Sequence, residues 1–337
     1  MNKESILKIL RDIAYPPYSK DIVAFGMVKY VKADENSAEV RIFTGGDAEL
    51  AKKITAKASS LLERAFPNKK IDVILLSEDP EKKAAPTPKK DTLAGVKIIV
   101  AVASGKGGVG KSTVAVNLAR AFARMLSKNG EARVGLMDCD IHGPSATILF
   151  GEKIFPAVNA EQKIVPPQIE GIKVISMGML VEDDQPLLWR GPMVTGAIKQ
   201  FAEDLAWGEL DAMVVDLPPG TGDAVLTAAQ TIPFGGAIIV TTPNNLAAVT
   251  AARGAMIFEK LNVKILGVVE NMAYLEMPDG SKEYIFGEGF ADGAAARLNT
   301  GVIARLPLDK TMHTGRPSES SEEIFDSLAK QIADALK

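Results

Sequence analysis

The apolar positions of residues 1–76 change from a helical period to a strand period and back. In "SILKILRDI" the isoleucines and leucines share one helical face, and Ser5 is placed to begin the helix. "GMVKYVKA" and "AEVRIFTGG" are separated by the polar "DENS", which predicts a β-hairpin. A second helix is expected over 47–65 and a strand at "IDVILL". Residues 1–76 therefore predict a small α+β domain.

The pattern of apolar and polar residues changes at residue 77 and again at residue 96. The segment 77–95 contains three prolines and many charged residues, with Leu93 as its only large apolar side chain, which is typical of a linker. From residue 96 onward, helical segments alternate with short, mostly apolar runs: "VKIIVAVAS", "ARVGLMD", "DAMVVDLPP", "GAIIVTTP" and "KILGVVENM". Strands that are apolar on both faces suit a parallel sheet covered by helices. Residues 96–337 thus predict a doubly wound, mostly parallel α/β sheet that binds ligands at the carboxyl ends of its strands.

Composition and charge narrow the class of protein. Of the 337 residues, 47% are hydrophobic and 24% charged, which is ordinary for a globular protein, and the formal net charge is −3. That balance offers no basic field for non-specific nucleic-acid binding. The first residues lack an apolar stretch followed by a small-residue cleavage site, and the apolar runs are shorter than the roughly 20 residues that cross a bilayer. We expect a cytoplasmic protein without nucleic-acid or membrane partners.

The stretch "GKGGVGKST" carries the clearest chemistry. It fits G-x-x-x-x-G-K-[ST] and lies between a predicted strand and a predicted helix with Leu118, Phe122, Met125 and Leu126 on one face. Glycines allow backbone N–H groups to point at phosphate oxygens, and the helix N-terminus adds partial positive charge. Lys111 is expected to reach the β- and γ-phosphates and Ser112 to bind Mg²⁺. The predicted nucleotide-binding residues here are Gly105, Lys106, Gly107, Gly108, Val109, Gly110, Lys111, Ser112 and Thr113.

A second lysine, Lys106, precedes the usual one in this loop. The loop resembles the deviant phosphate-loop ATPases with K-G-G-x-G-K-[ST], a group that includes the MinD/ParA, nitrogenase iron-protein and Mrp/ApbC families. The resemblance implies that Lys106 crosses a dimer interface and contacts the nucleotide of the partner, as an arginine finger does. It also implies a homodimer with ATP in the interface, and ATP hydrolysis with Lys106, Lys111 and Asp140 as catalytic residues.

Three further stretches agree with this resemblance. In "LMDCDIHGPS", Asp138 would support the Mg²⁺ shell and Asp140 would orient or activate the attacking water. In "VVDLPPGTGD", Asp216 would bind Mg²⁺ through water and Gly220 would sense the γ-phosphate. In "ENMAY", Asn271 stands where the group has its adenine-reading asparagine. Each aspartate alone is more typical of a strand-end cap or a turn, but together, in order and each after an apolar strand, they favour the site.

Other residues resemble the Mrp/ApbC branch in particular. These are "WRGPM" (189–193), "DCDIHGPS", "DLPPGTGD" and "IFGEG" (285–289). The first 76 residues resemble the small SufT-like domain that precedes the ATPase in many members, with "DIVAFGMVKYV" as the matching element. Members of this branch are iron–sulfur cluster carriers or scaffolds that bind and hydrolyse ATP, so the resemblance implies ATP, Mg²⁺ and an iron–sulfur cluster.

The sequence departs from this branch at the expected cluster ligands. A Cys-x-x-Cys pair is expected after the "ENM" strand, and two subunits would then supply four thiolates to one bridging cluster. Here Met277-Pro278-Asp279-Gly280 occupies that place, and "TGGDAELAKK" also lacks a cysteine. The only cysteine, Cys139, could in a dimer join His142 in a two-Cys, two-His set, although a lone cysteine is more commonly a small buried apolar residue.

Two classes of function are compatible with the sequence. The first is a dimeric, slowly hydrolysing ATPase that carries or assembles iron–sulfur clusters, with a client or scaffold protein that has the thiols. The alternative is a MinD/ParA-like nucleotide switch, or a regulatory ATP-binding protein, with no cluster. A membrane-associated switch needs a basic amphipathic tail. The tail "SSEEIFDSLAKQIADALK" is amphipathic but mostly acidic, so we expect it to pack on the protein's own sheet.

Overall fold

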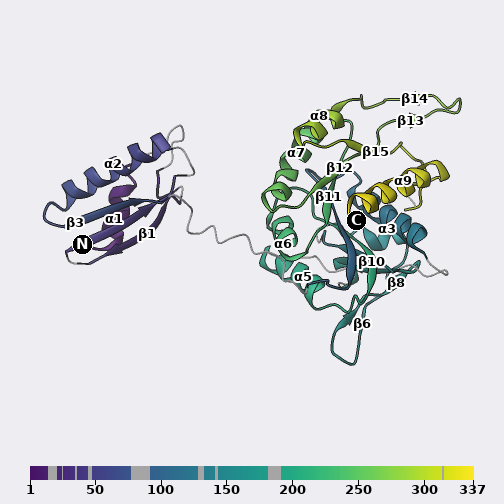
Figure 1. Cartoon of the computed structure of the whole chain (residues 1–337), viewed down its shortest axis with the longest axis horizontal. Coiled ribbons are helices and arrows are strands. Elements are labelled where there is room, and N and C mark those ends of the chain that lie inside the picture. Colours follow the sequence, from purple (N-terminus) through teal and green to yellow (C-terminus); the bar gives the residue numbers. More distant parts are fainter. Residues whose placement is uncertain are drawn as a thin grey trace. The chain divides into compact units, whose positions relative to one another are not determined.

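The chain forms two compact units, Met1–Ala85 and Pro86–Lys337 (Figure 1). The structure, a computed structural model, describes residues 1–13, 21–24, 26–34, 36–44, 48–76, 92–127, 133–140, 143–180, 191–312 and 315–337, without the side chains of 48–50 and 192. Most of the segment predicted as linker, residues 77–91, lies outside these residues. The end of that segment is not linker-like, because Leu93 is buried in the core of the second unit.

In its described residues, the first unit is a three-stranded sheet with two helices. Its elements are α1 (Lys3–Leu10), β1 (Val28–Ala33), β2 (Ser37–Ile42), α2 (Ala48–Ala65) and β3 (Lys70–Leu75). The strand order is β1-β2-β3, with β1 antiparallel to β2 and β2 parallel to β3. The predicted hairpin is confirmed, and Asp34 accepts hydrogen bonds from the backbone N–H groups of Asn36 and Ser37 in its turn.

Helix α1 begins earlier than the sequence pattern predicted. Asn2 is the N-cap: its side chain accepts a hydrogen bond from the N–H of Ser5, while the Ser5 hydroxyl bonds back to Asn2. Ser5 therefore closes a capping box from the third helical position instead of beginning the helix. The helix ends at Leu10, yet Ile13 is still buried in the same core.

The second unit is built on an eight-stranded sheet. The strand order is β15-β12-β11-β4-β10-β5-β9-β8, and the pairs are parallel except for β8 with β9. The strands are β4 (Val96–Ser104), β5 (Val134–Asp138), β8 (Gln168–Ile169), β9 (Ile172–Ser176), β10 (Leu210–Asp216), β11 (Gly236–Thr241), β12 (Ile265–Glu270) and β15 (Val302–Arg305). Strand β4 lies between β10 and β11, so the chain reverses its winding direction around β4, where α/β sheets bind ligands.

Helices cover both faces of this sheet (Figure 1). One core contains residues of α5 (Gly191–Glu203), α6 (Asp223–Thr231), α7 (Asn245–Lys260) and α8 (Phe290–Arg297). The other contains residues of α3 (Lys111–Leu126), α4 (Ala146–Phe150) and α9 (Glu319–Ala335). The predicted doubly wound, mostly parallel α/β sheet is thereby confirmed.

Several elements were not predicted. The remaining short elements are β6 (Ala157–Val158), β7 (Ile164–Val165), η1 (Met177–Met179), β13 (Leu275–Glu276) and β14 (Lys282–Glu283). Strands of two residues and the five-residue α4 are too short to show a period, so tertiary contacts rather than local pattern define them. On α3, Leu118 and Phe122 are buried as predicted, but Met125 is exposed.

The C-terminal helix α9 packs on the second unit. Phe325, Leu328 and Ile332 are buried in one core with residues of α3, which confirms the expectation that the tail docks on the protein's own fold. Within the described part of the chain, no helix has the length and apolar character that crossing a membrane requires.

We expect Leu328→Ala to lower the free energy of unfolding of the second unit by about 3 kcal/mol, because a fully buried leucine leaves a cavity when it is truncated. Both tryptophans, Trp189 and Trp207, belong to this unit, so tryptophan fluorescence during urea unfolding measures it. The exposed Lys330→Ala on the same helix is the control, with a change of at most about 0.5 kcal/mol. Equal effects of the two substitutions would contradict the packing role of α9.

Candidate functional site

The predicted site residues gather where three neighbouring parallel strands end. Asp216 ends β10 and pairs in register with Asp138, which ends β5, and Asp138 pairs with Ser176 at the end of β9. On the other side of β10, strand β4 leads directly into the phosphate loop. Parallel pairing alone thus brings carboxylates from two distant segments beside the loop.

The phosphate loop borders an open cavity of about 420 Å³. Its walls include the predicted residues Lys106, Gly107, Gly108, Gly110, Lys111, Ser112, Thr113 and Asp140. Helix α3 begins at Lys111, so its free N–H groups and partial positive charge face the same space. Lys106 is half-exposed, and its backbone carbonyl accepts a hydrogen bond from the Ser104 hydroxyl.

Lys111 is the only lysine of the described residues that is buried, and it is held by carboxylates. Its Nζ lies 2.5 Å from Oδ1 of Asp216 and 3.9 Å from Oδ2 of Asp140, and it also reaches the Ser112 hydroxyl at 3.4 Å. Burial by itself lowers the pKa of Lys111, but the charge of Asp216 and the hydrogen bond to it outweigh burial and leave the pKa raised. The ammonium is therefore charged and available to phosphate oxygens.

Asp138 is fully buried beside this ion pair. Its carboxylate accepts hydrogen bonds from the N–H of Asp140, the N–H of Ala146 and the Ser176 hydroxyl. Burial and the charge of Asp216 raise the pKa of Asp138 to about 7 despite these donors and Lys111. Burial likewise raises the pKa of Asp216, against the opposing effect of Lys111. The two buried carboxylates of Asp138 and Asp216 repel each other, so their arrangement favours binding of a divalent cation that would relieve this repulsion.

The donor set fits Mg²⁺ held together with nucleotide phosphates. Mg²⁺ usually keeps several waters and binds one or two carboxylates plus phosphate oxygens. The Ser112 hydroxyl, Asp138 and Asp216 are the residues that would hold it, directly or through water. Among the described residues, no group of three or more His, Cys, Asp or Glu side chains is arranged as a metal site by itself.

Two predicted nucleotide contacts are engaged with the protein in this structure. The N–H of Gly220 donates to the Ser104 carbonyl at 2.8 Å, and the Asn271 side-chain amide donates to the Val109 carbonyl at 2.9 Å. The left-handed Gly110 has φ +78°, and a Cβ there would lie 2.1 Å from the Asn271 amide nitrogen. Asn271 thus holds the loop from behind and does not line the cavity, and only glycine fits at position 110.

The cavity also has walls that the sequence did not reveal. Ser145, Ile148 and Leu149 come from the unpredicted helix α4 and the residue before it, and Pro219 comes from the loop after β10. The "DIHGPS" motif contains Ser145, so it could have been found, whereas Ile148 and Leu149 carry no motif. Ile148 is also the most exposed large apolar side chain among those described.

Of the two residues considered as cluster ligands, only Cys139 lies within the described part of the chain. Cys139 is fully buried in an apolar core, and burial together with the charges of Asp138 and Asp216 raises the pKa of its thiol well above the ordinary value. A cluster ligand must be a thiolate, so Cys139 is unsuited to that role here. His142 lies outside the described residues. Met277–Gly280 closes the turn of the β13–β14 hairpin, where Asp279 accepts hydrogen bonds from Ser281.

The raised pKa of Asp138 makes the stability of the nucleotide-free protein depend on pH. The folded chain keeps a proton up to about pH 7 that the unfolded chain, with a pKa near 3.8, has already lost. The free energy of unfolding should therefore fall as the pH rises from 5 to 8 in Mg²⁺-free buffer. Asp138→Asn should make this decline shallower.

Urea unfolding at several pH values measures this slope. Asp204→Asn is the matched control, because Asp204 is exposed just after α5. The same slope in Asp138→Asn and in the unchanged protein would contradict a buried, proton-holding Asp138.

Comparisons with known proteins place this site in a family. Residues 95–336 match the family model described as ParA, NUBPL iron-transfer P-loop NTPase. A Synechocystis protein named iron-sulfur cluster carrier protein is 36% identical over 99% of this chain and 97% of its own length. A nucleotide-binding protein from Archaeoglobus fulgidus, solved in complex with ADP, is 37% identical, covers 72% of this chain and 90% of its own, and superposes with a TM-score of 0.56.

A more distant structure shares the fold alone. The cell-division ATPase MinD of Pyrococcus furiosus is 20% identical, covers 71% of this chain and 99% of its own, and has a TM-score of 0.50. The family model matches most of the second unit, and the Synechocystis relative matches along nearly the whole chain. This chain belongs to the ParA/NUBPL family of iron-transfer P-loop NTPases.

Proposed function

We propose that this chain is an ATPase that binds Mg²⁺-ATP at the end of β4 and hydrolyses it slowly, as an assembly factor in iron–sulfur cluster transfer. The observation that carries the proposal is the convergence of Lys111, Asp216, Asp138 and Asp140 beside the phosphate loop. Family membership and the ADP bound to the relative from Archaeoglobus fulgidus support the choice of ligand.

ATP binding would exchange one partner of Lys111 for another. Its ammonium now pairs with Asp216, so phosphate oxygens entering the cavity compete with that carboxylate. Asp216, released from Lys111, would then face Mg²⁺ together with Asp138. The cation would neutralise charge on the β- and γ-phosphates. Asp140, at the cavity wall, would orient the attacking water and accept its proton.

Lys106 would complete the site in a homodimer. It is half-exposed at the cavity rim, and the buried Lys111 already serves the phosphates from within the same chain. A face-to-face second copy would place its own Lys106 on the transferring phosphoryl group, as the K-G-G-x-G-K resemblance implies. The exposed Ile148 beside the same cavity is an apolar contact for such a partner.

The cluster itself would be cargo held largely by other proteins. The hairpin turn at Met277–Gly280 has no thiol, and the single Cys139 lies in the core. A client or scaffold with cysteines would supply the thiolates, while this chain supplies the nucleotide-driven conformational change. A cytoplasmic location fits this role. The MinD-like alternative shares the fold but rests on 20% identity, whereas the relatives named iron-sulfur cluster carrier proteins support the iron–sulfur role.

Two substitutions should separate ATP binding from turnover. Asp140→Asn should keep ATP affinity within about threefold while lowering turnover about 10²-fold, because it removes the proton acceptor and keeps the shape. If hydrolysis requires the homodimer, turnover per subunit should rise with protein concentration. Lys106→Ala should bind ATP but lose that rise. Phosphate release at several protein concentrations and ATP titration measure these effects, with the exposed Asp204→Asn as control. Full turnover in Asp140→Asn would refute the assigned role.

Anaerobic reconstitution with iron and sulfide tests the cargo assignment. We expect no stable visible chromophore and no tightly bound iron in the isolated chain, with ATP turnover intact, because the thiols of the family site are absent. Cys139→Ser is the control variant. A stable chromophore that disappears in Cys139→Ser would contradict the proposal and make Cys139 a ligand. A chromophore that persists in that variant would point to ligands other than thiols.

A further inference from the structure

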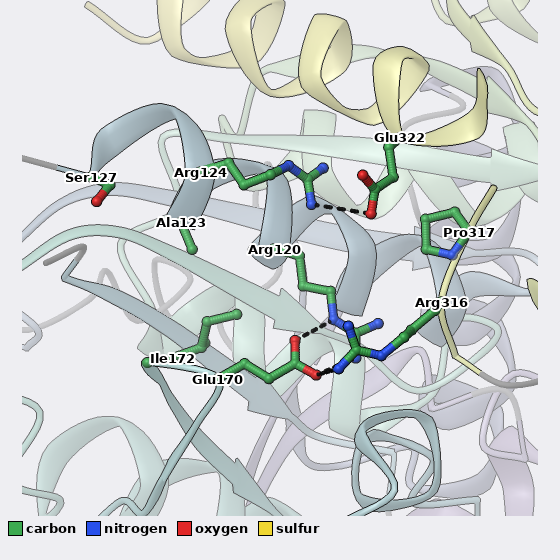
Figure 2. Close-up of a pocket in the computed structure, with 10 residues that line it drawn as sticks. Arg120, Ala123, Arg124, Ser127, Glu170, Ile172, Arg316, Pro317 and Glu322 are labelled. Atoms are coloured by element: carbon green, nitrogen blue, oxygen red, sulfur yellow. Dashed lines mark hydrogen bonds and ion pairs between the residues drawn. The ribbon is translucent and has the colours of Figure 1, made fainter. Parts of the chain in front are cut away.

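Arg120 lies on α3, two turns beyond the phosphate loop, and is buried in a polar cluster (Figure 2). Its five N–H donors all have partners. The Nε donates to Glu170 at 2.8 Å, Nη1 donates to Asn117 at 3.2 Å and to the Gly315 carbonyl, and Nη2 donates to Glu170 at 3.1 Å and to the Leu149 carbonyl at 3.4 Å. A guanidinium with no free donor is a connector between segments and not a binding site for an anion.

One set of these contacts holds the end of α4. The last carbonyls of a helix have no partner within the helix, and Arg120 supplies one to Leu149 from a different helix. Its guanidinium carbon also lies 4.8 Å from the centre of the Phe150 ring. Arg120 therefore contacts both of the last two residues of α4.

The loop before α9 packs closely against the end of α4. Gly315 has φ +77°, and a Cβ there would lie 1.9 Å from the Leu149 carbonyl oxygen. Only glycine allows this contact, and the Gly315 carbonyl accepts a hydrogen bond from Arg120. Arg120, Gly315 and Leu149 thus form one tight contact between α3, α4 and the C-terminal loop.

The remaining contacts anchor Arg120 on both sides. Glu170, in the turn between β8 and β9, pairs with Arg120 and with Arg316, as Figure 2 shows. The Asn117 side chain accepts a hydrogen bond from Arg120 and donates one to the carbonyl of Thr113. Thr113 lines the nucleotide cavity. The position of Arg120 is therefore set by the phosphate-loop helix at one end and by the sheet edge at the other.

Helix α4 in turn contacts Asp138, which is a predicted Mg²⁺ residue, and lines the nucleotide cavity. The N–H of Ala146, its first residue, donates to Asp138, and Ile148 and Leu149 line the nucleotide cavity. The segment that leads into α4 carries Asp140. A shift of α4 would move the groups that orient Asp138 and the wall that faces Asp140.

We propose that Arg120 is a positioning residue for ATP hydrolysis: it fixes α4, and with it the Asp138–Asp140 segment, to the phosphate-loop helix. This inference rests on the proposed ATPase function. Arg120 does not line the nucleotide cavity, so its loss should impair turnover more than nucleotide binding, since a displacement of about 1 Å at a catalytic group can cost about 10²-fold in rate.

The test compares Arg120→Lys and Gly315→Ala with the matched variant Arg124→Lys. Lysine keeps the charge but not the five-donor fork, and alanine at 315 pushes on Leu149 without removing a polar group. Arg124 lies one turn on and pairs with Asp326 and Glu322 of α9, so its replacement leaves α4 untouched. The measurements are kcat, ATP affinity, and hydrogen exchange of the amides of Leu149, in α4, and of Gly151, the residue that follows it; both donate to carbonyls of this segment.

We expect both test variants to lower kcat tenfold or more, to keep ATP affinity within about threefold and to speed exchange of the α4 amides. Arg124→Lys should match the unchanged protein. Unchanged kcat and exchange would overturn the proposal, as would a parallel loss of kcat and affinity with early unfolding, which would indicate a general structural role.

ATP turnover of the unchanged protein distinguishes the proposed ATPase function from the role of Arg120. If the unchanged protein fails to hydrolyse ATP, the proposed function is wrong. The exchange comparison then decides by itself whether Arg120 holds α4, and equal exchange in Arg120→Lys and the unchanged protein would overturn the inference.

Discussion

The ion pair between Lys111 and Asp216 is the interaction on which the arrangement of the site depends. A buried ammonium or carboxylate is strongly destabilising alone, and each tolerates burial here because the other lies 2.5 Å away. The pair joins the first residue of α3 to the last residue of β10, and so fixes the phosphate loop against the sheet. In the proposed function, incoming phosphates must open the same pair, so this one contact would both stabilise the nucleotide-free site and control nucleotide binding.

Polar contacts radiate from this pair in two directions. Toward the sheet edge, Asp138 collects donors from Asp140, Ala146 and Ser176, so the end of β5, the start of α4 and the end of β9 meet at one carboxylate. Along α3, Asn117 and Arg120 continue the connection to the far end of α4 and to Glu170. Helix α4 has only five residues, which is too short to be stable alone, and these contacts at both of its ends hold it in place.

The chemistry of the hairpin turn contrasts with that of the proposed nucleotide site, whose residues from this chain lie close together. The loop, the buried lysine and three aspartates are assembled, while the segment 277–280 forms a turn stabilised by Asp279 and Ser281. Cys139, the one thiol, is packed between residues that raise its pKa by burial and by negative charge. A protein with this distribution suits nucleotide-dependent work on a cluster that another protein ligates.

The sequence by itself determined the phosphate loop, the five central strands and the strand-end aspartates, because a fixed motif and continuous apolar runs are local signals. It also indicated the two units and the packing of the last helix, whose apolar face needs a surface. Only the tertiary structure decided that Asn271 bonds to the loop backbone, that Leu93 joins the core and that Arg120 caps α4. Each of these contacts joins segments far apart in the chain, and such contacts leave no period or motif in the sequence.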